Sequence, residues 1–216
     1  GPNGAGKTTT IKMLCTLLAP SGGRASIAGF DVVASPEEVR RRIGVIFQDP
    51  ALDGGLTALE NLELHAVAYG IHRSERARRM DEALGLVGLT ERARDLVRTF
   101  SGGMKRRLEI ARGLLHQPEI FFLDEPTLGL DPQTRARTWE VLRALKEERR
   151  TTLFLTTHYM DEAENCDRIA IIDSGRIVAL DSPAALKNKV GKDVVRARTD
   201  EPERLMTLLA ERYGIS

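Results

Sequence analysis

Three features are scarce in this sequence of 216 residues: cysteine, an excess of charge of one sign, and long apolar runs. The only two cysteines, Cys15 and Cys166, are far apart and lack the spacing of a metal site, so we expect reduced thiols that fill apolar space. The 32 basic and 31 acidic side chains nearly cancel. This balance excludes a global field that would gather nucleic acid or an anionic membrane, and we expect no nucleic-acid partner.

No apolar run approaches the ~20 residues that a membrane-spanning helix needs. If the protein works at a membrane, we therefore expect another polypeptide to cross it. The hydrophobic content of 42% is ordinary for a soluble globular core and argues against a disordered or fibrous chain. The length suits one large domain or two modest ones.

What the sequence does contain is a series of short β-branched runs that alternate with helical stretches, which is typical of a layered α/β domain. The runs are apolar at successive positions, so we expect strands of a central sheet covered on both faces. The turn Asp173-Ser174-Gly175 should lead from the last run into a further strand, Arg176 to Ala179. The four runs are Ile43 to Phe47, Ile120 to Leu123, Leu153 to Thr156 and Ile169 to Ile172.

Helix starts are marked by capping signals. Ser35 to Glu38 and Thr57 to Glu60 both have the pattern of a capping box, and Asp131 stands as N-cap before a proline. From about residue 49 to residue 115 strand signals vanish and helical periodicity takes over, with a stop at Gly88.

These patterns predict an α/β core built from residues 1–48 and 116–190, with a helical lobe, residues 49–115, inserted into it. Residues 191–216 would begin an accessory segment, with a short strand at Val194 to Ala197 and a helix from Pro202 to Tyr213.

The first residues of the chain match the phosphate-loop pattern, in which glycines let backbone N–H groups close around phosphate oxygens at a helix N-terminus. Lys7 would supply a charge to the β and γ phosphates of ATP, Thr8 a hydroxyl to Mg²⁺, and Thr9 a donor to the inner phosphates. The motif normally follows a buried strand, so we expect the protein to begin upstream of it. The expected nucleotide-binding residues are Gly1, Pro2, Asn3, Gly4, Ala5, Gly6, Lys7, Thr8 and Thr9.

A second element is the apolar run from Ile120 to Leu123, which ends in two carboxylates, Asp124 and Glu125. An acid at the carboxyl edge of a sheet can hold Mg²⁺, which is the role expected of Asp124. Glu125 could then polarise the attacking water as a general base. The other interpretation is a plain polar turn after a strand.

A third element is Ser101-Gly102-Gly103 at the start of a helix with an apolar face. A hydroxyl and two glycines at a helix start can form a second anion site, so one nucleotide could be sandwiched between two copies of the chain. Ser101 can equally serve as an N-cap. The basic runs Arg40 to Arg42 and Lys105 to Arg107 could attract phosphate, but we expect solvated helix faces.

With these elements in this order, the chain resembles the ABC ATPase family over nearly its whole length, to about Val190. The signature serine and glycines of this family match Ser101, Gly102 and Gly103. Met104 and Phe100 replace the glutamine and leucine that are usual beside them. The resemblance implies a P-loop NTPase (RecA-like) core with an inserted helical subdomain, truncated at its N-terminus before the strands and the adenine-stacking aromatic. It also implies roles: Gln48 as the Q-loop residue that senses Mg²⁺ and water, Asp131 in the D-loop, and His158 as the switch histidine on the γ-phosphate. On its own, His158 could as readily be a satisfied strand-end histidine.

A narrower resemblance, to the daunorubicin-resistance type of ATP-binding subunit, comes from four segments. It implies an ATP-hydrolysing subunit, most simply a homodimer, on the cytoplasmic face of the cell membrane that drives a separate permease exporting drugs or other amphiphilic compounds. Two other functions stay open: a non-transport ABC ATPase acting on ribosomes or DNA, and a nucleotide-binding regulator without turnover. The segments begin at Gly29, Val39, Ser101 and Thr156.

Overall fold

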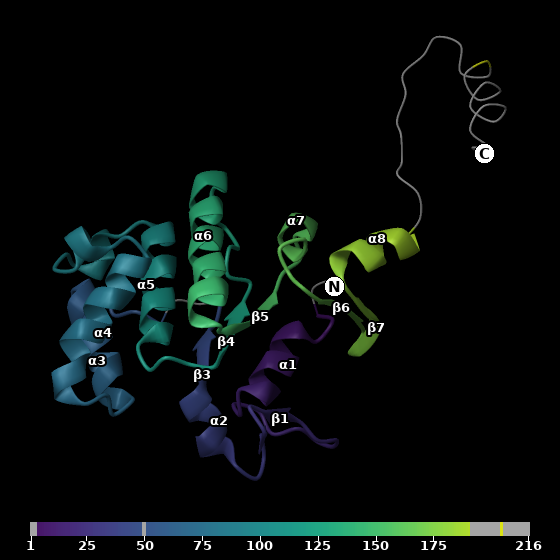
Figure 1. Cartoon of the computed structure of the whole chain (residues 1–216), viewed down its shortest axis with the longest axis horizontal. Helices are drawn as coiled ribbons and strands as arrows, with labels where there is room; N and C mark the ends of the chain where they lie inside the picture. Colours follow the sequence, from purple (N-terminus) through teal and green to yellow (C-terminus); the bar gives the residue numbers. More distant parts are fainter. Residues whose placement is uncertain (1–3, 49–50, 191–203, 205–216) are drawn as a thin grey trace.

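The computed structural model describes residues 4–48, 51–190 and 204. Its centre is a three-stranded parallel sheet in the order β3-β4-β5 (Figure 1). Parallel strands end at one edge of the sheet, and here Asp124, the last residue of β4, pairs with Thr156 of β5. The strands are β3 (Ile43–Ile46), β4 (Ile120–Asp124) and β5 (Thr152–Thr156).

The middle strand is covered on both faces because its successive side chains point to opposite sides. Phe121 and Leu123 belong to one apolar cluster, with residues of α5 and α6, whereas Phe122 belongs to a second cluster with Ile11 and Val39 from α1 and α2. The sheet therefore lies between two helical layers. The four helices are α1 (Lys7–Leu14), α2 (Pro36–Arg42), α5 (Gly102–Leu114) and α6 (Pro132–Arg149).

Helix α5 approaches the sheet closely because two glycines leave room for one aromatic ring. A Cβ atom on Gly44 of β3 would lie 2.5 Å from the ring of Phe121, and one on Gly113 of α5 would lie 2.7 Å from it. Any larger residue at either position would push α5 off the sheet. The helix that begins at Ser101 is thereby held at a fixed distance from the ends of β3 and β4.

Further helices stand beside α5, on the left of Figure 1. They share one apolar cluster with α5, in which Leu62, Leu84 and Leu89 are fully buried. The helical character predicted for this stretch is confirmed over residues 51–115, and α4 ends as expected, just before Gly88 with φ 64°. The boundaries of a separate lobe stay a prediction. The elements are α3 (Ala58–Ala68), α4 (Arg73–Leu86), η1 (Thr90–Arg92) and η2 (Val97–Thr99).

The prediction that all four apolar runs join one covered sheet was wrong. The run at 169–172 forms β6 (Ile169–Asp173), which pairs antiparallel with β7 (Arg176–Asp181) in a separate hairpin. The turn predicted at 173–175 is confirmed, since Ser174 and Gly175 both have positive φ and fold the chain straight back on itself. Among the described residues, neither strand of this hairpin pairs with β5. Strand β5 is also only partly covered, since Phe154 is exposed.

The two predicted capping boxes differ in outcome. The Thr57 hydroxyl accepts a hydrogen bond from the backbone N–H of Glu60, whose carboxylate accepts one from the N–H of Thr57 in return. Ser35 precedes α2 as predicted but makes no side-chain cap. Its intended partner Glu38 instead pairs with Arg42, at 2.7 Å, so the second box was wrong because an ion pair one turn along the helix takes the carboxylate.

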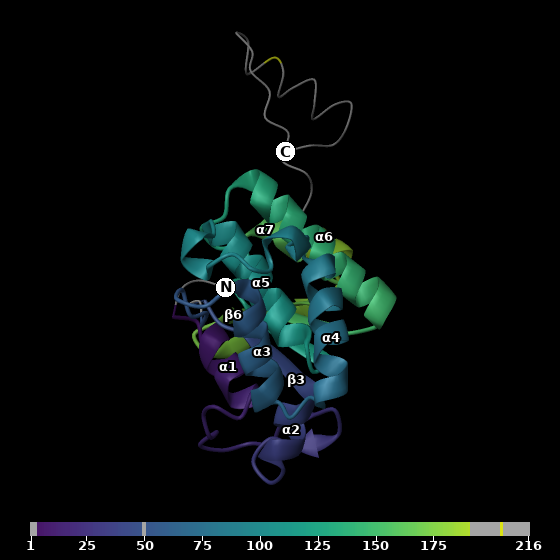
Figure 2. The ribbon, with the colours of Figure 1, turned by 90° about the vertical axis from the view of Figure 1, so that its left-hand side faces the viewer.

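The remaining elements are short: Figure 1 labels β1 in its lower part and α8 at the right, and Figure 2 labels α7 near the top of the ribbon. Both cysteines are free thiols, and burial raises the pKa of Cys15 to about 12.

The predicted strand at 194–197 and helix at 202–213 lie outside the described residues, apart from residue 204. Over the described residues, no helix has the length and apolar character to cross a bilayer. The remaining short elements of the fold are β1 (Ser26–Ile27), β2 (Phe30–Asp31), α7 (Met160–Ala163) and α8 (Pro183–Val190).

Candidate nucleotide site

The phosphate-loop motif leads directly into α1. Gly4 and Gly6 have φ of 79° and 104°, in the left-handed region that glycine adopts without a Cβ clash, and Gly6 is the N-cap of the helix. The carbonyl of Ala5 accepts a hydrogen bond of 2.9 Å from the N–H of Gly175 in the β6–β7 turn. The loop is thus held from its outer side by a hairpin distant in sequence. Residues 1–3 of the motif lie outside the described part.

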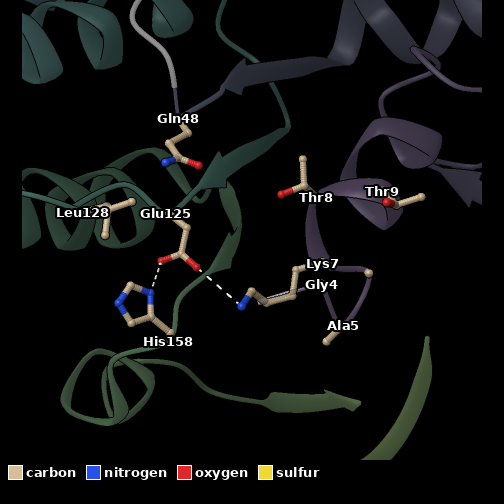
Figure 3. Close-up of a pocket in the computed structure, with 10 residues that line it drawn as sticks. Gly4, Ala5, Lys7, Thr8, Thr9, Gln48, Glu125, Leu128 and His158 are labelled. Carbon is tan, nitrogen blue, oxygen red and sulfur yellow. Dashed lines mark hydrogen bonds and ion pairs between the residues drawn. The ribbon is translucent and has the colours of Figure 1, made fainter. Parts of the chain in front are cut away.

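A pocket of about 440 Å³ opens above this loop. Figure 3 shows Lys7 and Thr8 on one wall and Gln48, Glu125 and His158 on the other. The second wall comes from three segments, which follow β3, β4 and β5. The structure therefore brings together most of the residues predicted from the sequence to bind nucleotide or act on it. The lining residues are Gly4, Ala5, Gly6, Lys7, Thr8, Thr9, Gln48, Glu125, Leu128 and His158.

The predicted metal-binding pair is in contact. Asp124 is buried at the end of β4, and its Oδ2 accepts a hydrogen bond of 2.8 Å from the Thr8 hydroxyl. Its Oδ1 accepts one of 2.5 Å from Thr156. A carboxylate beside a hydroxyl, both at the mouth of a phosphate loop, is the donor set that Mg²⁺ takes in such sites together with substrate phosphates and water. The residues present fit the ion.

Glu125 combines a strained backbone with contacts to two other side chains of the pocket. Its φ of 49° lies in the left-handed region, which a non-glycine residue adopts only when its surroundings enforce it, and such strain clusters at functional sites. Its N–H donates to the Thr156 hydroxyl at 3.0 Å. The carboxylate lies 3.6 Å from Lys7 Nζ through Oε1 and 2.9 Å from His158 Nδ1 through Oε2 (Figure 3). Glu125 is therefore directed into the pocket from a strained turn.

The signature residues are not part of this pocket. The Ser101 hydroxyl caps α5 by accepting from the N–H of Met104, while Gly102 is exposed. Gly103 is buried, and a Cβ there would lie 2.2 Å from a methyl carbon of Thr134 in α6, so close helix packing already requires a glycine. A role of these three residues toward nucleotide stays a prediction.

Asp131 likewise lies outside the pocket. Its carboxylate caps α6 by accepting from the N–H of Thr134 at 3.0 Å. The hydrogen bonds from Thr134 hold the pKa of Asp131 below its usual value. The predicted N-cap is confirmed, and the predicted nucleotide contact is untested.

The sequence analysis missed two residues at this site. Leu128 lines the pocket, and Thr156 bonds to both Asp124 and Glu125. The signal for Thr156 was its place at the end of a parallel strand next to Asp124. The expectation of solvated faces was wrong for Arg106 and Arg107, which are 7% and 9% exposed. Helix α5 is enclosed on more sides than its apolar face alone suggests.

Comparisons with known proteins identify the family and the fold. The family model described as ABC transporter matches residues 1–128. The daunorubicin/doxorubicin resistance ATP-binding protein DrrA of Streptomyces peucetius is 45% identical over 214 residues, which is 96% of this chain and 64% of that protein. The Nod factor export ATP-binding protein I of Cupriavidus metallidurans is 42% identical, and the match covers 98% of this chain and 71% of that one.

Among solved structures, a dimeric ATP-binding cassette in a post-hydrolysis state, bound to ADP and Pi, matches with a TM-score of 0.76 and 31% identity. That match covers 85% of this chain and 83% of the other. The fold is that of the P-loop NTPases, and the chain belongs to the ABC transporter family of ATP-binding proteins. The chain spans 64% of the length of the relative from Streptomyces peucetius, so its matches describe a part of such a protein.

Proposed function

We propose that this chain is the ATP-binding and ATP-hydrolysing part of an ABC transporter subunit that drives a separate membrane permease. The observation that carries the proposal is the position of Glu125, which lies in a strained turn at the end of β4. Its carboxylate lies between Lys7 and His158, in the pocket lined by the phosphate loop. A carboxylate, a cation and an imidazole converging beside a helix N-terminus suit phosphoryl transfer from ATP to water.

The roles follow from these positions. The N–H groups at the start of α1 and the ammonium of Lys7 bind the phosphates, and Lys7 would exchange its contact with Glu125 for one with phosphate. Glu125 is then free to orient a water and accept its proton. His158, held by Glu125 from the opposite side, can donate to a phosphate oxygen.

Mg²⁺ would be held by Thr8 and Asp124, and by Gln48 from the pocket wall opposite Thr8. When bound, the ion would neutralise charge on the phosphates. Asp124 is fixed for this role by two hydroxyl donors, one from α1 and one from β5.

We propose that the second anion site, at Ser101, Gly102 and Gly103, completes the nucleotide site of another copy in a homodimer, and that Asp131 contributes to the same shared site. Ser101 and Gly102 are exposed at the start of α5 and lie outside the pocket, so they remain available to a partner. A cassette with a similar fold forms a dimer bound to ADP and Pi. Both nucleotide sites would then be shared between subunits.

The transport role and its direction are proposed from the relatives, two of which are named for drug resistance and for Nod factor export. The cargo would be a drug or another amphiphilic compound, and the chain would sit on the cytoplasmic face of the membrane, beside its permease. These names speak against the alternative of an ABC ATPase acting on ribosomes or DNA.

The test is ATP hydrolysis by the full-length protein with and without its permease in proteoliposomes. Lys7→Ala should abolish hydrolysis, whereas Lys12→Ala, a change at an exposed residue of the same helix, should preserve it. Export of a fluorescent amphiphile should require ATP and wild-type Lys7. Hydrolysis that survives Lys7→Ala would contradict the proposed site.

A further inference from the structure

Arg106 in α5 is buried, although arginine is almost never buried without partners. Its guanidinium has five N–H groups, and five oxygen acceptors lie within reach. Four of them are backbone carbonyls at the carboxyl ends of β3 and β4. These are Phe47 at 2.6 Å, Asp124 at 3.0 Å, Glu125 at 3.3 Å and Pro126 at 2.9 Å.

The fifth acceptor is Glu109, one turn further along α5 and only 1% exposed. Its Oε2 accepts from Arg106 at 3.1 Å, while its Oε1 accepts from the backbone N–H of Ala51 at 2.9 Å. The pair therefore holds the chain on both sides of Gln48: Arg106 binds the carbonyl just before it, and Glu109 binds the N–H three residues after it.

We propose that Arg106, held by Glu109, is a positioning residue for ATP hydrolysis: it fixes Gln48 and Glu125 relative to the helix that carries the signature. This inference rests on the proposed function. It assigns no contact with nucleotide to Arg106 itself. The physical reason is that Gln48 and Glu125 follow two different strands. The rigid, planar guanidinium of Arg106 donates hydrogen bonds to the ends of both strands.

The planar arrangement of the arginine N–H donors matters more here than the positive charge. Lysine would keep the ion pair with Glu109, but its three donors on one atom cannot reach carbonyls spread over two strand ends. Arg107, the next residue, provides the matched control. It is also buried in α5, yet its hydrogen bond goes to the carbonyl of Val87, after α4 and away from the pocket.

The experiment compares Arg106→Lys and Arg107→Lys in the full-length protein, measuring kcat, KM, the Kd for ATP and Tm. Arg106→Lys should lower kcat by about 10- to 100-fold, because small displacements of catalytic groups have effects of that order. The Kd for ATP should change by no more than about threefold, since Lys7 and the loop are untouched. Arg107→Lys should lower Tm by about as much as Arg106→Lys does, while its kcat stays within about threefold of wild type.

Glu109→Gln is the second variant, for the case in which Arg106→Lys does not fold. Its amide oxygen can still accept from Ala51, but the charge that holds Arg106 is lost, so kcat should fall by less than in Arg106→Lys. The inference is overturned if kcat changes by less than about threefold in Arg106→Lys, or in Glu109→Gln where Arg106→Lys does not fold, or if Arg107→Lys loses as much kcat at equal Tm.

A separate readout distinguishes failure of this inference from failure of the proposed function. If the wild-type protein binds ATP without hydrolysing it, the proposed function fails, and hydrogen exchange at the Glu125 amide, which donates to the Thr156 hydroxyl, decides the inference. Exchange that is faster in Arg106→Lys and unchanged in Arg107→Lys supports positioning by Arg106, and equal exchange in all three proteins overturns it.

Discussion

His158 Nδ1 lies 2.9 Å from Glu125 Oε2, so the two side chains expected to act on the γ-phosphate are hydrogen-bonded to each other. They come from segments 33 residues apart in sequence, after β4 and β5, which are neighbours in the sheet. This contact keeps Glu125 within the pocket and fixes the ring of His158 beside it. Loss of either side chain should therefore affect the other.

Glu125→Gln should keep ATP binding and lose at least about 99% of turnover, because an amide cannot accept the proton of the attacking water. Lys7, Thr8 and Asp124 stay intact, so the Kd for ATP should stay near wild type. Steady-state phosphate release and equilibrium binding measure the two quantities. Glu119→Gln, at an exposed glutamate just before β4, is the control and should hydrolyse ATP normally. Near-normal turnover in Glu125→Gln would show that another group is the base.

Two inactive variants should rescue each other if the nucleotide site is shared between subunits. Lys7→Ala damages the loop half of both sites in a homodimer, and Ser101→Arg damages the signature half. A mixed dimer places both lesions in one site and leaves the other intact. Subunit exchange between the two full-length proteins, tagged differently, should therefore restore part of the ATPase activity. Mixed dimers with no activity above either parent would exclude independent shared sites.

The two capping motifs should respond differently to alanine. Thr57→Ala removes a hydroxyl that caps α3 and should lower the free energy of unfolding by about 1 kcal/mol. Ser35→Ala removes a hydroxyl that makes no cap and should change it by less than about 0.5 kcal/mol. Denaturant titration of both variants measures the difference. Equal losses of unfolding free energy in the two variants would mean that the type of residue at the N-cap, rather than the hydrogen bonds it makes, determines the loss.

A ring cluster between α3 and the end of α5 should make stability depend on pH. Burial, with Arg112 and His116 nearby, lowers the pKa of His65 from 6.5 to about 4, and burial lowers that of His116 too. The unfolded chain therefore takes up a proton at higher pH than the folded one. Stability contributed by neutral His65 is complete above about pH 6.5 and is lost as pH falls toward 4.

His65→Phe should flatten the dependence of unfolding free energy on pH across this window, because the substituted ring does not titrate. The control is Tyr69→Phe, at the ring that lies 4.5 Å from His65 between centroids. It preserves an aromatic ring and removes no group that titrates between pH 4 and 6.5. Denaturant midpoints at several pH values give both slopes, and equal slopes in His65→Phe and wild type would contradict the assignment.

Much of the site could be predicted from the sequence because its elements are local. The spacing of glycines before Lys7 needs only the backbone freedom of glycine and a helix start, and Asp131 before a proline needs only the orphan N–H groups of that helix. The carboxylates at Asp124 and Glu125 follow from a strand that ends in two acids. These signals act over a few residues, and the fold and family that they imply agree with the structure and its relatives.

The tertiary structure decided what depends on residues distant in sequence. It kept the predicted hairpin of β6 and β7 apart from the three-stranded sheet and paired the carboxylate of Glu38 with Arg42. It also buried Arg106, which was expected on a solvated helix face, among backbone carbonyls at the strand ends. It also brought Gln48 and His158 to one pocket. In each case the deciding factor is which partner comes within hydrogen-bonding or packing distance, and packing of the whole chain sets that, since local propensity is weaker than tertiary contact.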